Sequence, residues 1–127
     1  MMSKLFSVDL YIKIKENTFA AKKLTADGHW QSIVSQEPFT TQRLLVGSFS
    51  EAERALTQLL KRVLGQGIFA KKPKVVIHPM EKVEGGLSQI EDRIFRELAL
   101  GAGALKVVVH TGPELTDSQA IKLIHGV

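Results

Sequence analysis

The sequence contains no cysteine. Without thiols the chain forms no disulfide framework and carries no thiolate nucleophile, so a cytoplasmic location is the default expectation. No uninterrupted apolar stretch reaches the roughly 18 residues of a membrane span, which predicts a chain without one. The first residues also lack the apolar core and the small-residue cleavage site of a secretory signal.

What is present fits a globular α/β protein. The chain has 127 residues, of which 44% are hydrophobic and 24% charged. These proportions are ordinary for a folded domain and argue against disorder. The sequence shows no internal repeat, linker or low-complexity tract, so we expect one domain over residues 1–127.

The formal net charge is +4. A basic balance suits an acidic partner, but the lysines are spread along the chain. The tightest group is Lys71, Lys72 and Lys74, which flank a proline before an apolar run, where lysines commonly solubilise the entry to a strand. We therefore expect no nucleic-acid binding.

The first third of the sequence predicts an antiparallel meander. Residues 7–15 alternate strictly: Val8, Leu10, Ile12 and Ile14 share one face, and Asp9, Tyr11, Lys13 and Lys15 share the other. This pattern predicts a half-buried strand. A turn at Glu16-Asn17 leads to a strand over 18–25. Asp27-Gly28, a pair that accepts positive φ, leads to a strand over 29–36, and residues 43–46 are a candidate extended segment.

The remainder alternates helices with short apolar strands. Three capping boxes open the expected helices, formed by Ser50 with Glu53, Ser88 with Glu91, and Thr116 with Gln119. Glycines end the first two helices, at Gly65 and Gly67 and at Gly101 and Gly103. The runs 74–78 and 105–110 are typical of strands covered on both faces.

The resulting order, β-β-β-α-β-α-β-α, predicts an α/β fold with a five-stranded mixed sheet flanked by about three helices. Three strands would be antiparallel and two parallel. This is the order of the ribonuclease H-like fold, which is also that of an actin-like ATPase half-domain.

The stretch 90–115, IEDRIFRELALGAGALKVVVHTGPEL, resembles a segment of the bacterial rod-shape-determining actin homologues, the MreB family. An apolar strand ending in proline, 75–79, precedes a helix with a Glu91-Arg93 pair and Arg96-Glu97, and the helix closes on a Gly-Ala-Gly-Ala stretch, 101–104. Residues 7–10 are similar to the start of the family's first strand. The resemblance implies the N-terminal half of such a protein.

That resemblance also shows where this chain departs from the family. In the family, the aspartate of the first strand precedes a Gly-Thr loop that holds nucleotide phosphates, whereas Asp9 is followed by Leu10, Tyr11 and Ile12. No glycine lets a phosphate approach the backbone. Glu91 falls where the family places a carboxylate that positions the attacking water, but it is also the third residue of a capped helix. We therefore expect no nucleotide, no other cofactor and no ATP hydrolysis.

Two alternative hypotheses assign the chain an enzymatic activity or a metal site. A metal-dependent nuclease or phosphoryl-transfer enzyme would use Asp9 with Glu51 or Glu53 and a further acid at the end of the strand 74–78, where the sequence instead has His78, with Glu81 three residues later. A metal site would instead join His78 and His110, which close two adjacent strands, with Glu81 or Glu114 as a further ligand.

The leading hypothesis is a non-catalytic, truncated MreB-like protein that acts by protein-protein contact. Apolar residues of the last helix, 120, 121, 123 and 124, would stay partly uncovered in a half-molecule, and such surface is usually covered by partners. We therefore expect a protein partner or self-association as a homo-oligomer, linked by resemblance to bacterial cell-shape machinery.

Overall fold

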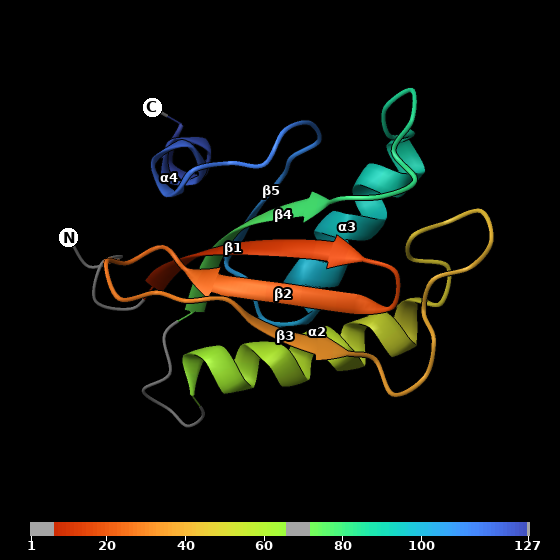
Figure 1. Cartoon of the computed structure of the whole chain (residues 1–127), viewed down its shortest axis with the longest axis horizontal. Coiled ribbons are helices and arrows are strands. Elements are labelled where there is room, and N and C mark those ends of the chain that lie inside the picture. Colours follow the sequence, from red (N-terminus) through yellow and green to blue (C-terminus); the bar gives the residue numbers. More distant parts are fainter. Residues whose placement is uncertain (1–6, 66–71, 127) are drawn as a thin grey trace.

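The computed structural model describes residues 7–65 and 72–126. It contains a five-stranded sheet and three helices (Figure 1). In chain order the elements are β1 Ser7–Lys15, β2 Thr18–Lys23, β3 Gln31–Val34, α2 Phe49–Leu64, β4 Lys72–Pro79, α3 Gln89–Gly101, β5 Lys106–Val109 and α4 Asp117–His125. None of the helices in these ranges is long and apolar enough to cross a membrane.

The strand order is β3-β2-β1-β4-β5. β1 pairs antiparallel with β2, and β2 pairs antiparallel with β3. β4 lies parallel to β1 and to β5. The predicted fold class, α/β with a mixed sheet of ribonuclease H-like order, is confirmed by this arrangement.

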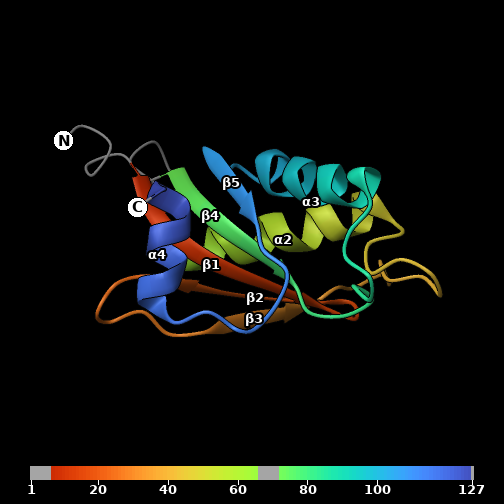
Figure 2. The same cartoon turned by 90° about the horizontal axis from the view of Figure 1, so that it is seen from above.

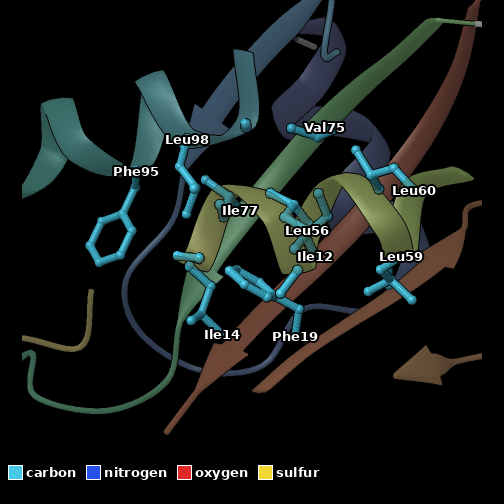
Figure 3. Packing of buried hydrophobic residues seen from close by; sticks show 14 of the residues in the cluster. Ile12, Ile14, Phe19, Leu56, Leu59, Leu60, Val75, Ile77, Phe95 and Leu98 are labelled. Atoms are coloured by element: carbon cyan, nitrogen blue, oxygen red, sulfur yellow. The ribbon is translucent and has the colours of Figure 1, made fainter. Parts of the chain in front are cut away.

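One face of the sheet carries the main core. The alternating residues Leu10, Ile12 and Ile14 of β1 are fully buried there, as the sequence pattern predicts. α2 and α3 cover this face and contribute Leu56, Leu59, Leu60, Phe95 and Leu98 to the same cluster (Figure 3).

The other face is partly covered, which corrects the expectation of a solvated second face on β1. Tyr11 is only 1% exposed and packs in a second cluster with Leu24, Val76, Ala120 and Ile124. The chain leaves β5 and returns over this face to place α4 across it, opposite α2 and α3 (Figure 2). β1 is therefore buried on both faces over its central residues.

Two expected local features are absent. Residues 43–46 form bends and no strand, because Thr41 closes a turn onto Leu44 while Leu45 and Val46 turn inward to the core. Gly28 does not adopt positive φ. It is required for a different reason: a Cβ at this position would lie 1.9 Å from the Lys23 carbonyl oxygen. By contrast, Asn17 does have positive φ, 53°, in the predicted turn after β1.

Strand limits also shift. β3 is shorter than expected, and β4 is longer, running through Pro73 to Pro79 because β1 pairs with it along its whole length. Lys71 and Gly67 lie outside the described residues.

Two of the three predicted capping boxes are confirmed. Ser88 with Glu91 and Thr116 with Gln119 each make both reciprocal hydrogen bonds. The first box is wrong: α2 begins at Phe49 after Ser48, and Ser48 makes no side-chain cap. Glu53 instead reaches α3, where its Oε2 lies 2.0 Å from the position a Cβ on Gly101 would take.

Candidate interaction surface and the network beneath it

A basic and aromatic surface lies on the sheet face that faces away from α2 and α3. We call it the lysine–tryptophan surface, formed by Lys13, Lys15, Lys22 and Trp30. β1 places Tyr11, Lys13 and Lys15 on this face by its period of two. The register pairs Tyr11 with Lys22 of β2, which brings the third lysine to the same face.

Trp30 sits at the centre of this surface. Its ring meets the Tyr11 ring edge-on, with centroids 5.2 Å apart and planes at 62°. The Lys13 Nζ lies 4.4 Å from the Trp30 ring centroid, and the Lys22 Nζ lies 5.3 Å from it. Such cation–π contacts hold the ammonium groups against the indole. The side chain nevertheless remains 38% exposed.

Beside Trp30 the surface is hollowed. An open depression of about 280 Å³ is lined by Lys13, Lys15, Thr18, Ala20 and Trp30. Its lining is mostly apolar and includes the side chains of two lysines. This combination suits a group that is apolar at one end and anionic at the other.

Two lysines of the surface are already engaged by carboxylates, one from the segment before α4 and one from the first residue of α4. Lys13 forms an ion pair with Glu114, and the Lys22 Nζ lies 2.6 Å from Asp117 Oδ1. Burial lowers the pKa of Lys13, and the nearby charges of Lys15 and Lys22 lower it further. The charges of Lys15 and Lys22 therefore add to burial in disfavouring the charged form of Lys13.

Beneath the surface a buried polar network joins β1, β4 and the returning chain. The Tyr11 hydroxyl lies 2.7 Å from His78 Nδ1 and accepts a hydrogen bond from the Leu115 amide at 3.1 Å. His78 Nε2 lies 3.0 Å from the Gly112 carbonyl oxygen. A carbonyl only accepts, so Nε2 carries the proton and Nδ1 accepts from Tyr11.

Their surroundings favour the neutral forms of the His78 imidazole and the Tyr11 phenol. Burial lowers the pKa of His78, and the neighbouring His110 and Lys13 lower it further, against the opposing effect of the Gly112 carbonyl. Burial raises the pKa of Tyr11, opposed by the Leu115 amide. A neutral imidazole and a neutral phenol are the forms that this chain of hydrogen bonds requires.

The structure brings His78 and His110 together, as predicted. Their ring centroids are 4.6 Å apart at 70°. Both nitrogens of His78 are committed to protein partners, and His110 Nε2 contacts the Pro113 carbonyl at 2.9 Å. The two expected further ligands are also engaged, Glu81 by the Glu16 amide and Glu114 by Lys13. Within residues 7–65 and 72–126 no three side chains of metal-ligating type gather.

Asp9 lies apart from the carboxylates proposed as its partners. Its Oδ2 is 2.8 Å from Nε2 of His125, at the end of α4. Glu51 and Glu53 belong to α2, on the opposite face of the sheet. Asp9 pairs with Lys74 at the start of β4, four residues before His78, which is roughly 13 Å along a strand. The acidic cluster expected for a nuclease does not form.

Glu91 is a capping residue. Its side chain accepts from the Ser88 amide at 3.1 Å, while its own amide donates to the Ser88 hydroxyl at 3.1 Å. This is the role its place in the sequence indicated.

Sequence reasoning placed the lysines of β1 on one face but did not find the surface. Trp30 was expected in a strand over 29–36, but it lies in the connection before β3, where the alternation of a strand does not set its direction. The Tyr11–His78 pair was also missed, although two polar aromatic residues in adjacent apolar strands are a recognisable signal for a buried hydrogen bond.

Fold and site together define an α/β domain with a ribonuclease H-like sheet, a buried tyrosine–histidine network and a partly open basic face. No protein-family model matches the sequence. The chain is 32% identical over 102 residues to "Uncharacterized protein YjaA" of Escherichia coli strain K12, a match that covers 76% of this chain and 78% of that protein. The chain belongs to the YjaA family.

Among solved structures, the PPX-GPPA enzyme of Aquifex aeolicus is similar with a TM-score of 0.46 and 14% sequence identity. The match covers 83% of this chain, which spans only 36% of the length of that one.

Proposed function

We propose that this chain is a non-catalytic domain of actin-like fold that works in the cytoplasm by protein-protein contact. The observation that carries the proposal is the partly open sheet face, where Trp30, the only tryptophan of the chain, and Lys15 are exposed beside the hollow. Aromatic residues with partly exposed rings are enriched where proteins bind one another.

The course of β1 supports a non-catalytic role. β1 is continuous from Ser7 to Lys15 and pairs on both sides, so its backbone amides at Leu10, Tyr11 and Ile12 lie within a sheet. A phosphate-binding loop needs amides that converge on one point outside a ladder. The carboxylate of Asp9 is also held by His125.

The resemblance to the MreB family extends the proposal. A protein of this kind would dock onto a cytoskeletal or envelope-associated partner of the cell-shape machinery, or self-associate as a homo-oligomer. Leu123 of α4 and Leu105 before β5 are 38% and 54% exposed, and such apolar side chains are the kind that self-association covers.

The proposal is tested by capture from cells of the native organism after in vivo crosslinking, followed by reconstitution with purified proteins. We expect a discrete protein partner that forms a complex of fixed stoichiometry with the purified chain. Light scattering after size-exclusion chromatography measures self-association in the same preparation. A strictly monomeric chain that forms no complex with any captured protein would contradict the proposal.

A further inference from the structure

We propose that the lysine–tryptophan surface binds an extended acidic segment of a partner protein. Carboxylates of that segment pair with Lys15 and Lys13, and an adjacent apolar side chain packs against Trp30 in the hollow. This inference rests on the proposed function, since it names the kind of protein segment that the same surface takes.

The arrangement of charge favours an anionic occupant. Lys15 is exposed and forms no ion pair with any residue of 7–65 or 72–126. Beyond the effect of burial, the charges of Lys15 and Lys22 disfavour the charged form of Lys13. An added carboxylate between Lys13 and Lys15 relieves this repulsion. The surface is therefore complementary to negative charge.

The chain itself indicates which anion fits. Glu114 reaches Lys13 from the irregular segment before α4, and Asp117, the first residue of α4, reaches Lys22. A carboxylate outside the helices and strands is thus already paired with Lys13, the lysine that contacts the Trp30 ring. A partner segment that continues this pattern would find Lys15 and the hollow beside it still available.

The same carboxylates disfavour nucleic acid. Three lysines set against Glu114 and Asp117 leave a single net positive charge, whereas a phosphate backbone is bound by several uncompensated cations. Single-stranded nucleic acid also stacks successive bases on several aromatic side chains. Trp30 is the only exposed aromatic ring of the lysine–tryptophan surface, because Tyr11 beneath it is buried.

Trp30 provides the apolar half of the site. Its ring is fixed by the edge-on contact with Tyr11 and by Lys13, so little side-chain entropy is lost when a ligand covers it. Fixed aromatic side chains next to a hollow are typical anchors of an interface. The anchor therefore selects a segment in which an apolar residue lies beside a carboxylate.

The test uses fluorescein-labelled peptides of about nine residues and the full chain. One peptide alternates glutamate with leucine, a second replaces glutamate by glutamine, and a third replaces leucine by serine. Anisotropy measures affinity, and fluorescence of Trp30, the only tryptophan, reports whether binding occurs at this surface. We expect saturable binding of the glutamate–leucine peptide with a matching change in tryptophan emission, and binding at least tenfold weaker for the other two.

Variants then assign the contacts. Lys15→Ala should weaken binding about two- to fivefold and Lys15→Glu more than tenfold, as expected for a partly exposed ion pair and for its reversal. Glu114→Gln should strengthen binding, because it releases Lys13. The matched control is Lys61→Glu, an exposed lysine of α2 on the far side of the sheet, which should leave affinity unchanged. Circular dichroism confirms that each variant is folded.

Several results would overturn the inference: equal binding of the neutral peptide, no response of Trp30, or equal effects of Lys15→Glu and Lys61→Glu. Tighter binding of a single-stranded oligothymidine that depends on Lys15 would assign the surface to nucleic acid instead. These outcomes are separate from failure of the proposed function. A partner protein that binds the Lys15→Glu variant as well as the wild type would leave that function intact and show that the partner binds a different surface of the chain.

Discussion

The hydroxyl of Tyr11 and Nδ1 of His78 lie 2.7 Å apart, buried between adjacent strands of the sheet. The same hydroxyl accepts a hydrogen bond from the amide of Leu115, which lies 104 residues away in the sequence. One phenol oxygen thus ties β1 to β4 and to the segment that carries Glu114 and Asp117 onto the lysine–tryptophan surface. The buried network and the open surface are parts of one arrangement.

Tyr11→Phe removes this tie without removing the ring. His78 Nδ1 then loses its donor and the Leu115 amide loses its acceptor, and leaving buried polar groups unpaired costs about 1–3 kcal/mol. We expect the free energy of unfolding to fall by that amount, measured by urea unfolding followed by circular dichroism. The control, Lys61→Ala on an exposed helix face, should change it by less than about 0.5 kcal/mol. Equal values for the two variants would show that the network contributes nothing to stability.

The stability of the chain should depend on the protonation of His78. Burial lowers its pKa in the folded state, with His110 and Lys13 acting in the same direction and the Gly112 carbonyl opposing them. The unfolded chain, with an ordinary histidine pKa of about 6.5, therefore binds the proton more readily. The contribution of His78 is fully present above about pH 6.5 and is lost progressively as the pH falls below that value.

This dependence is measured by unfolding in urea at several pH values between about 5 and 8, a range in which ordinary carboxylates stay ionised. We expect the His78→Gln variant to be less stable at high pH and to lose less stability than the wild type as the pH falls. Parallel curves for the two proteins would assign the pH dependence to other groups.

Glu91 should matter as a hydrogen-bond acceptor more than as a charge. Glu91→Ala and Ser88→Ala each remove half of the capping box, so each should cost about 1 kcal/mol of stability. Glu91→Gln keeps the acceptor and should cost less than about 0.5 kcal/mol, the part that the helix dipole contributes. Thermal unfolding of the three variants measures the difference. A Gln variant as unstable as the Ala variant would contradict the capping role.

The sequence was sufficient to predict the order of strands and helices along the chain and most of the main core. The alternation in residues 7–15 identified which residues of β1 share a face, and the short apolar runs identified two parallel strands. These features depend on local periodicity, which the fold preserves because α2 and α3 need one continuous apolar face.

Long-range contacts explain most of what was missed. The second face of β1 was expected to be solvated because Asp9, Lys13 and Lys15 are charged, yet the return of the chain after β5 covers Tyr11. The lysine stems accommodate this burial while their ammonium groups remain near water or meet Glu114 and Asp117. The local sequence pattern of β1 does not indicate that a distant segment will cover its second face.

The start of α2 was missed for a different reason. Ser50 with Glu53 satisfies the capping pattern, but Phe49 packs against the main core and belongs to the helix. Burial of an aromatic side chain is worth more than one side-chain cap, so packing moves the first turn two residues earlier than the capping pattern does.

The most direct test of the account is calorimetric titration of the purified chain with Mg-ATP. A β1 strand paired on both sides, with Asp9 held by His125, predicts no heat of binding at ATP concentrations up to about the millimolar range that weak sites require. Micromolar binding that Asp9→Asn abolishes would contradict the non-catalytic interaction role.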